Sequence, residues 1–257
     1  MRRVAFAVGL AASLAVASAV AKVTAPDYAR EARWASEVAP QIVVGDSLWL
    51  VVPDRPRVLA IFTEPAGTPK GAIVVVHGVG VHPDWNLIGE LRTKLADRGY
   101  ATLAVQMPVL AADAPRDAYR ELFSDASDRI GAAFAWLRAK GFTKVAIVSH
   151  SMGASMTDAY LTRANAAQPD AWAPVGMLAD FAKVPRMPVL DVVAERDFPE
   201  VLSAARLRAL QLQRDDCSTR VTIAGTDHYM TQATTALADA VAAFLGRAFA
   251  GACRRRP

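Results

Sequence analysis

The feature that most constrains the fold is a regular alternation, from Ala72 to near the end of the chain, of short apolar runs with longer amphipathic segments. The run from Ala72 to Val76, with one isoleucine and three valines, is typical of a strand that is buried on both faces. Strands that alternate with helices at this spacing favour a mainly parallel sheet. We therefore predict a single-domain α/β fold with helices on both faces of the sheet.

The predicted elements are spaced along the whole chain, and the first two strands are expected to form an antiparallel lead-in. The longest irregular segment, Pro108 to Asp125, is expected to overhang a site at the strand ends. The predicted strands are Ser47 to Val52, Arg57 to Thr63, Ala72 to Val76, Ala101 to Val105, Lys144 to Val148, Val175 to Leu178, Pro188 to Val193 and Arg220 to Ala224. The predicted helices are Tyr28 to Val38, Leu87 to Arg98, Ser124 to Lys140, Met152 to Arg163, Val201 to Gln213 and Thr231 to Phe249.

Residues 1–21 have the layout of a secretory signal peptide. Two arginines form a charged n-region, Val4 to Val16 form a short apolar h-region, and Ala19 to Ala21 form an A-x-A cleavage signal. We expect cleavage before Lys22, a periplasmic or secreted domain of residues 22–257, and no stable membrane insertion after cleavage. An uncleaved anchor is the alternative, although the apolar stretch is shorter than the roughly 20 residues of a membrane span.

The formal charge of +4 does not indicate a nucleic-acid-binding protein. Two of the positive charges belong to the predicted signal peptide, and Arg254 to Arg256 supply three more at the C-terminus. The body of the chain is near neutral and has no basic face interleaved with aromatic residues. We expect no nucleic-acid partner and interpret the basic tail as a solvated end, although lipid or cell-wall association through it stays open.

The chain has two cysteines, Cys217 and Cys253, which flank the last predicted strand and the last predicted helix. A helix that returns antiparallel to the preceding strand brings its end back near the start of that strand. An exported protein also meets an oxidising compartment. We therefore predict a Cys217–Cys253 disulfide that stabilises the protein by roughly 3–4 kcal/mol, with two free thiols as the alternative.

The strongest local motif is the turn Ser149-His150-Ser151-Met152-Gly153, between a predicted strand and a predicted helix. A tight turn that holds a serine exposed at this point is the context of a G-x-S-x-G nucleophile elbow. Small residues are needed beside the serine because strand and helix approach closely there. Gly153 meets this need, whereas Ser149 replaces the first glycine. An ordinary turn that happens to contain a serine is the alternative.

On these residues the chain resembles the α/β-hydrolase superfamily, and the resemblance extends from about Ala72 to the end of the last helix. The turn is similar to the Gly-His-Ser-Met-Gly elbow of esterases, lipases and peptidases in that superfamily. The chain also resembles a group of secreted bacterial proteins with this fold, which implies no particular substrate. The resemblance implies a triad in the order Ser, acid, His.

The resemblance assigns the triad to Ser151, Asp197 and His228. Asp197 follows the predicted strand that ends at Val193, as the triad acid does, while Asp191 and Glu195 come too early along the chain. His228 ends a Gly-x-x-His segment like the one that carries the triad histidine, and the adjacent Asp227 is badly placed to orient its ring. In such a triad the histidine removes the serine proton and the acid fixes the histidine tautomer.

The backbone N–H groups of Met152 and Val79 are expected to bind the oxyanion. Val79 belongs to a His-Gly loop that resembles the oxyanion loop of the superfamily, although its glycines are also compatible with a plain turn. His77 is expected to structure this loop rather than to react, and His150 to pack behind the site.

Two further residues, His82 and Trp85, are candidates for lining the entrance to the site. His77, His82 and Asp84 could be considered as metal ligands, but their spacing is loose and no further strong cluster exists. We therefore expect neither a metal nor a cofactor.

Between the predicted strands ending at Leu178 and starting at Pro188 there are only about ten residues, which leaves no room for the cap domain that many superfamily members insert there. An open cleft is therefore expected. With the export expected from residues 1–21, the resemblance implies an exported serine hydrolase of carboxylesterase type that acts on a small-molecule or polymer ester, with peptidase or thioesterase action still open. The alternative is a catalytically silent envelope protein that uses the fold as a binding module, because of Ser149 and the absent cap.

Overall fold

The computed structural model describes residues 24–212 and 215–254. The predicted signal peptide, at residues 1–21, lies outside the described residues, as does the end of the basic tail from position 255. Among the helices of the described residues, none combines the length and the apolar character that crossing a membrane requires.

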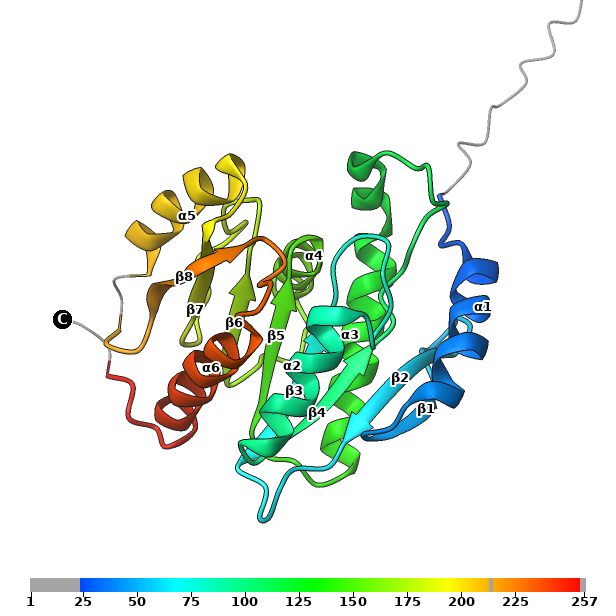
Figure 1. Cartoon of the computed structure of the whole chain (residues 1–257), viewed down its shortest axis with the longest axis horizontal. Coiled ribbons are helices and arrows are strands. Elements are labelled where there is room, and N and C mark those ends of the chain that lie inside the picture. Colours follow the sequence, from blue (N-terminus) through cyan, green and yellow to red (C-terminus); the bar gives the residue numbers. More distant parts are fainter. Residues whose placement is uncertain (1–23, 213–214, 255–257) are drawn as a thin grey trace, which may run out of the picture.

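An eight-stranded sheet forms the centre of the molecule (Figure 1). Its order is β1-β2-β4-β3-β5-β6-β7-β8, with antiparallel pairing of β1 with β2 and of β2 with β4, and parallel pairing of all other neighbours. The mainly parallel sheet and the antiparallel lead-in expected from the sequence are confirmed. The strands are β1 Asp46–Leu50, β2 Val58–Thr63, β3 Gly71–Val76, β4 Tyr100–Val105, β5 Val145–His150, β6 Ala171–Val175, β7 Leu190–Arg196 and β8 Thr219–Asp227.

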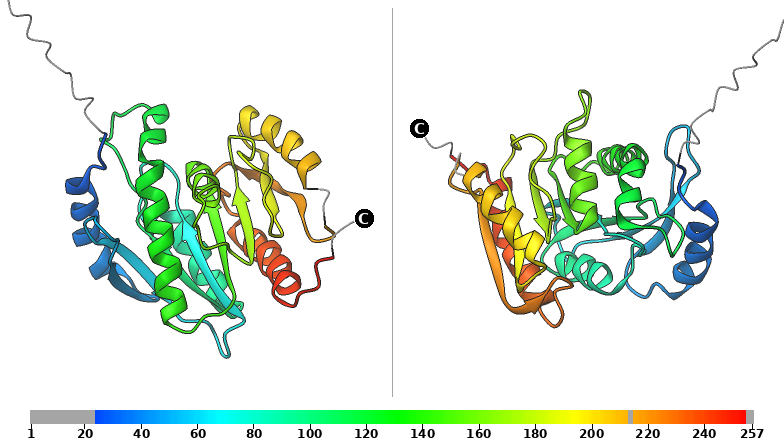
Figure 2. Two further views of the ribbon diagram at one scale, coloured as in Figure 1. Left: turned by 180° about the vertical axis from the view of Figure 1, so that it is seen from behind. Right: turned by 90° about the horizontal axis from the view of Figure 1, so that it is seen from above.

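Helices cover both faces of this sheet, as predicted (Figure 1 and Figure 2). Helices α2 (Asn86–Asp97) and α6 (Thr234–Phe249) pack on one face, and α3 (Phe123–Ala139) and α4 (Met152–Leu161) pack on the other. Helix α5 (Pro199–Gln211) packs on β7. The remaining helices are α1 (Tyr28–Val38) and two short 3-10 helices, η1 (Ala39–Gln41) and η2 (Arg116–Leu122). The described residues form one domain without a large cap.

The central strand β3 accounts for the two-layered core. All six of its residues are buried, and alternate side chains point to opposite faces of the sheet. Val74 and Val76 join the cluster beneath α3 and α4, whereas Ile73 and Val75 join the cluster beneath α2 and α6. A strand that contributes to both clusters must be apolar at every position, which is the pattern seen in the sequence.

The predicted position of β6 was wrong. The prediction was Val175 to Leu178, but the strand occupies Ala171–Val175 and ends where Gly176 adopts a φ of +61°. Pro174 lies within β6 but has no backbone N–H to donate, and a proline in the sequence argues against a central strand. The other element ends differ by a few residues; α6, for example, begins at Thr234 rather than Thr231. Residues 176–189 connect β6 to β7. This connection is longer than expected but still too short to contain a cap domain.

Cys217 and Cys253 form the predicted disulfide. Cys217 lies two residues before β8, and Cys253 follows α6, so the bond closes the last strand–helix unit of the fold. The Asp216 backbone N–H also donates to the Arg254 carbonyl, which fixes the end of the described chain beside the same loop.

Candidate active site

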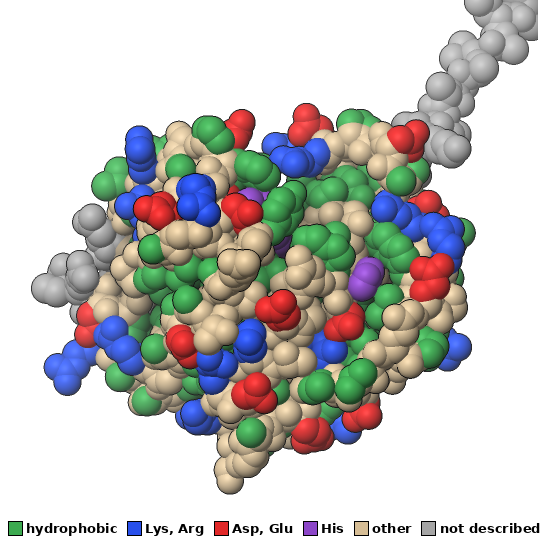
Figure 3. All heavy atoms as spheres, viewed as in Figure 1, with side chains coloured by type: hydrophobic (Ala, Val, Ile, Leu, Met, Phe, Trp, Pro, Cys, Tyr) green, Lys and Arg blue, Asp and Glu red, His purple; other side chains and the backbone are tan. Residues whose placement is uncertain are grey.

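Ser151, Asp197 and His228 each directly follow the last residue of a parallel strand. Ser151 follows β5, Asp197 follows β7 and His228 follows β8. Because the carboxyl ends of parallel strands meet at one edge of a sheet, three residues that are far apart in sequence come together there. Figure 3 shows histidine side chains among hydrophobic ones in the notch at this edge, which is the upper edge in Figure 1.

Two hydrogen bonds connect these three side chains in series. His228 Nδ1 lies 2.6 Å from Asp197 Oδ1, and His228 Nε2 lies 2.9 Å from Ser151 Oγ. Asp197 and His228 are buried, whereas Ser151 is partly exposed. The arrangement leaves the serine hydroxyl accessible and holds its hydrogen-bond partner in a fixed orientation. The structure thus brings together the three residues that the sequence analysis singled out.

The backbone at Ser151 is strained. Its φ of +55° and ψ of −124° lie outside the regions that a residue with a side chain normally occupies. Such conformations persist only where the surroundings enforce them, and they cluster at functional sites. The surroundings are tight here, since a Cβ at Gly153 would collide with the backbone carbonyl of His77. The sharp strand-to-helix turn expected from the sequence is therefore present.

The charge of Asp197 is stabilised in place. Burial alone would raise the pKa of this carboxyl, but hydrogen bonds from His228 and from the backbone N–H groups of Ala194 and Phe198 outweigh that effect and hold its pKa below its usual range. Asp197 is therefore an anion at neutral pH, and His228 Nδ1 donates to it. This fixes the tautomer in which Nε2 accepts a hydrogen bond from the Ser151 hydroxyl.

The other acids considered from the sequence have different partners. Asp191 forms a fully buried ion pair with Arg208 of α5, with both N···O distances at 3.0 Å. Glu195 accepts from the Gly225 N–H, and Asp227 accepts from the Tyr229 and Thr231 N–H groups. Among the described residues, these three carboxylates therefore stabilise the fold near the site and form no hydrogen bond to the His228 ring.

The loop after β3 is held by His77, as expected. His77 Nδ1 donates to the Gly78 carbonyl at 2.8 Å, and Nε2 accepts from the Met107 N–H at 2.8 Å. Burial lowers the pKa of His77 to about 3, so the ring is neutral and both nitrogens serve the loop. In the described part of the chain, the N–H groups of Val79 and Met152 donate no hydrogen bond. Both therefore remain available to an oxyanion.

Helix α1 braces this region from outside. Arg30 donates to the carbonyl of Leu110 at 2.6 Å, and Glu31 accepts from the Val109 N–H. Glu31 also forms a buried ion pair with Arg129 of α3 at 2.9 Å. These contacts fix the loop after β4, which itself carries the Met107 donor for His77.

A hollow of about 250 Å³ opens above Ser151. Trp85 lines it, as predicted, but His82 does not; its ring packs against Trp34 of α1 at 5.8 Å between centroids. The described residues that line it are Gly78, Val79, Val81, Trp85, Arg116, His150, Ser151, Phe198, His228 and Tyr229.

Three of the site's neighbours, Gly176, Phe198 and Arg116, were not recognised in the sequence. Gly176 lies against the triad, since a Cβ there would come within 2.9 Å of His228 Cε1. Phe198 stacks on the His228 ring at 4.3 Å, and Arg116 lies beside Phe198. His150 packs behind the site, as expected, with its Nε2 donating to the His228 carbonyl. Only strand-end position could have signalled Gly176, and nothing local marks Arg116.

The His150 ring packs against the His228 ring and is uncharged at neutral pH. The two rings lie 4.9 Å apart, and burial lowers the pKa of His150 to about 4. At neutral pH this ring therefore adds no positive charge that would oppose protonation of His228.

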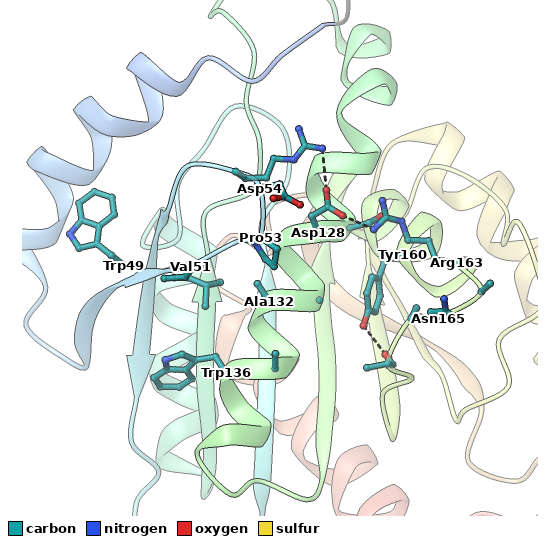
Figure 4. Close-up of a pocket in the computed structure, with 18 residues that line it drawn as sticks. Trp49, Val51, Pro53, Asp54, Asp128, Ala132, Trp136, Tyr160, Arg163 and Asn165 are labelled. Carbon is teal, nitrogen blue, oxygen red and sulfur yellow. Dashed lines mark hydrogen bonds and ion pairs between the residues drawn. The ribbon is translucent and has the colours of Figure 1, made fainter.

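A larger hollow lies away from Ser151, Asp197 and His228. It measures about 1050 Å³ and runs between the β1–β2 connection, α3 and α4 (Figure 4). Trp49, Trp136 and Tyr160 line it, and Asp128 accepts from both Arg55 and Arg163 at one end. Neither Ser151 nor His228 reaches it, so its size does not make it the candidate active site.

In the described residues, one group of side chains has metal-ligand spacing, namely Asp215, Asp216 and Cys217. The Cys217 sulfur is already bonded to Cys253, and the Asp215 carboxylate accepts from the Cys217 and Ser218 N–H groups. The Cys217 sulfur and the Asp215 carboxylate therefore already have structural partners within the protein.

The strand order and the strained serine turn define the α/β-hydrolase fold. Comparisons with solved structures agree on this fold. A dienelactone hydrolase from Anabaena variabilis aligns with a TM-score of 0.63 and 20% identity, over 78% of this chain and 96% of that chain. XC6422 from Xanthomonas campestris, a serine hydrolase without a lid, aligns at 0.62 and 17%, over 80% and 95%. Est1E from Butyrivibrio proteoclasticus, in its structure with ferulic acid bound, aligns with a TM-score of 0.62 and 17% identity, over 79% of this chain and 99% of that chain.

Sequence comparison is less informative. A family described as "Protein of unknown function (DUF3530)" matches residues 49–124, from β1 to the start of α3. No curated protein matches the chain.

Proposed function

We propose that this protein is an exported serine hydrolase of carboxylesterase type, in which Ser151, His228 and Asp197 act as the catalytic triad. The observation that carries the proposal is the pair of hydrogen bonds in series, 2.6 Å and 2.9 Å long, that ends on a partly exposed serine in a strained turn. A serine hydroxyl needs a positioned base in order to attack a carbonyl, and this geometry supplies one.

The proposed reaction proceeds through an acyl-enzyme. Ser151 Oγ attacks the ester carbonyl while His228 Nε2 takes its proton, and the Val79 and Met152 N–H groups bind the oxyanion. His228 then returns the proton to the departing alcohol. Water attacks the acyl-enzyme by the same steps in reverse and releases the acid. Asp197 stabilises the imidazolium in both halves. No step requires a metal or a cofactor.

The hollow supports small or surface-accessible esters as substrates. Its volume of about 250 Å³ is at the small end for a ligand site, and no domain covers it. A short acyl or alcohol group fits this space, and so does a short segment of an ester-containing polymer. Peptides and thioesters are the alternatives within the same mechanism.

Export is supported by the signal-like residues 1–21 and by the Cys217–Cys253 disulfide, since disulfides persist in oxidising compartments. We propose a periplasmic or secreted location. Sequencing the N-terminus of the purified protein tests this location. A chain that begins at Lys22 supports export with cleavage, and a chain that retains Met1 contradicts the proposal.

The catalytic proposal is tested by the hydrolysis of para-nitrophenyl acetate, butyrate and octanoate by the mature protein. We expect activity that is highest with the shorter chains and is lost in Ser151→Ala and His228→Ala. Ser203→Ala is the matched control, because Ser203 is exposed on α5 and outside the hollow. Folded protein without esterase, amidase or thioesterase activity would contradict the proposal and favour the silent binding module.

A further inference from the structure

The proposed mechanism leaves one charged residue of the hollow without a role. Among the described residues that line the hollow, Arg116 alone carries a permanent charge. The nearby Asp197 has no exposed side-chain surface and lies behind His228. A substrate that enters the hollow therefore meets a positive charge and no exposed negative one on its walls.

Arg116 is close to the reacting groups. Its guanidinium carbon lies 6.0 Å from the centroid of the Phe198 ring, and the same ring stacks on His228 at 4.3 Å. The guanidinium and the imidazole are thus both adjacent to one aromatic side chain. A group bound by Arg116 belongs to the part of the substrate near the bond that Ser151 attacks.

The guanidinium of Arg116 is free to bind a ligand. The side chain is exposed, and with the other described residues it forms neither an ion pair within 4.0 Å nor a hydrogen bond. By contrast, Arg55 and Arg163, which line the larger hollow, both pair with Asp128. The five N–H donors of a guanidinium form a planar fork that matches a carboxylate in two parallel hydrogen bonds.

We propose that Arg116 binds a carboxylate of the substrate, so that the preferred substrates are small esters that carry a carboxylate near the scissile bond. This inference rests on the proposed function. Trp85, Phe198 and Tyr229 surround the remaining space and favour an apolar or aromatic body between the carboxylate and the ester. Arg116 is a specificity residue in this scheme and takes no part in proton transfer.

The test compares two esters that differ only at the end of the acyl chain, para-nitrophenyl hydrogen adipate and para-nitrophenyl hexanoate. We expect the wild-type protein to prefer the adipate. Arg116→Gln should lower the adipate-to-hexanoate ratio of kcat/KM about tenfold, mainly through KM, because the charge-assisted hydrogen bonds are lost. High salt should weaken the preference of the wild type and have little effect on that of the variant.

Arg120→Gln is the matched control. Arg120 is exposed in the same 3-10 helix and does not line the hollow, so its replacement should leave the ratio as in the wild type. Equal ratios in wild type and Arg116→Gln, with both esters hydrolysed, would overturn the carboxylate site and leave the proposed function standing.

A binding measurement separates the two proposals if neither ester is hydrolysed. Benzoate needs no catalysis to bind, and calorimetric titration reports its affinity directly. Binding that weakens about tenfold in Arg116→Gln but not in Arg120→Gln supports the carboxylate site. Equal affinities, or no binding by the wild type, overturn it.

Discussion

The indole Nε1 of Trp172 lies 2.8 Å from Ser149 Oγ and donates a hydrogen bond to it. Trp172 on β6 is fully buried, and Ser149 on β5 is 1% exposed. Ser149 occupies the position of the first glycine in the G-x-S-x-G pattern. The departure from that pattern thus has a structural reason, because the serine hydroxyl is the partner of a buried indole on the neighbouring strand.

Because of this hydrogen bond, we predict that replacing Ser149 by the glycine of the usual pattern destabilises the protein. Ser149→Gly and Ser149→Ala should each lower the free energy of unfolding by about 1–3 kcal/mol, because the Trp172 N–H is left buried without an acceptor. Urea denaturation measures the change. In a double-mutant cycle with Trp172→Phe, the loss from Ser149→Ala should become smaller; additive effects would contradict the contact.

Gly176 is predicted to control the position of the triad histidine. An added Cβ would lie 2.9 Å from His228 Cε1 and 3.0 Å from Nδ1. Under the proposed function, Gly176→Ala should reduce kcat about a hundredfold, since small displacements of catalytic groups have effects of that order. Gly141→Ala is the control, because Gly141 also has a positive φ but a Cβ there meets nothing within 4 Å. Equal activity of the two variants would contradict the role of Gly176.

Asp158 on α4 is predicted to make stability depend on pH. Burial raises its pKa from 3.8 to about 6, against a hydrogen bond from the Ala182 N–H. Between these values the unfolded chain loses a proton that the folded chain keeps, so stability falls as the pH rises from about 4 to about 6 and stays lower above it.

Asp158→Asn removes this titration and retains an oxygen that can accept from Ala182. The variant should be more stable than the wild type at pH 8, by at most about 3 kcal/mol, and the difference should vanish near pH 4. Thermal denaturation at both pH values measures it. Asp180→Asn, an exposed position in the β6–β7 connection, is the control. A gain that is equal at both pH values would contradict the titration of Asp158.

The Cys217–Cys253 disulfide is predicted to stabilise the folded protein. Replacing both Cys217 and Cys253 by alanine should lower the free energy of unfolding by about 3–4 kcal/mol, because the bond closes a loop with a sequence separation of 36. Denaturation of the oxidised and alanine forms measures this loss. Two thiols that react with a thiol reagent in the folded, unreduced mature protein would contradict the bond.

The central part of the fold was predictable from the sequence because its strands are apolar at every position, as in β3. The three residues proposed as a triad could be picked out because each follows a strand, within motifs that resemble known ones. The position of β6 was predicted wrongly for two reasons. Pro174 is unusual in a buried strand, and the apolar residues after Gly176 resemble a strand in the sequence. The roles proposed for Gly176 and Arg116 depend on their positions relative to residues distant in the sequence, which no local pattern indicates.

The most direct test of the central claim is labelling of the mature protein with a fluorophosphonate, followed by mass mapping of the adduct. We predict one adduct, on Ser151, which is absent in Ser151→Ala, reduced in His228→Ala and unchanged in Ser203→Ala. Folded protein that forms no adduct at neutral pH, or an adduct that persists in Ser151→Ala, would contradict the claim that Ser151 is an activated nucleophile.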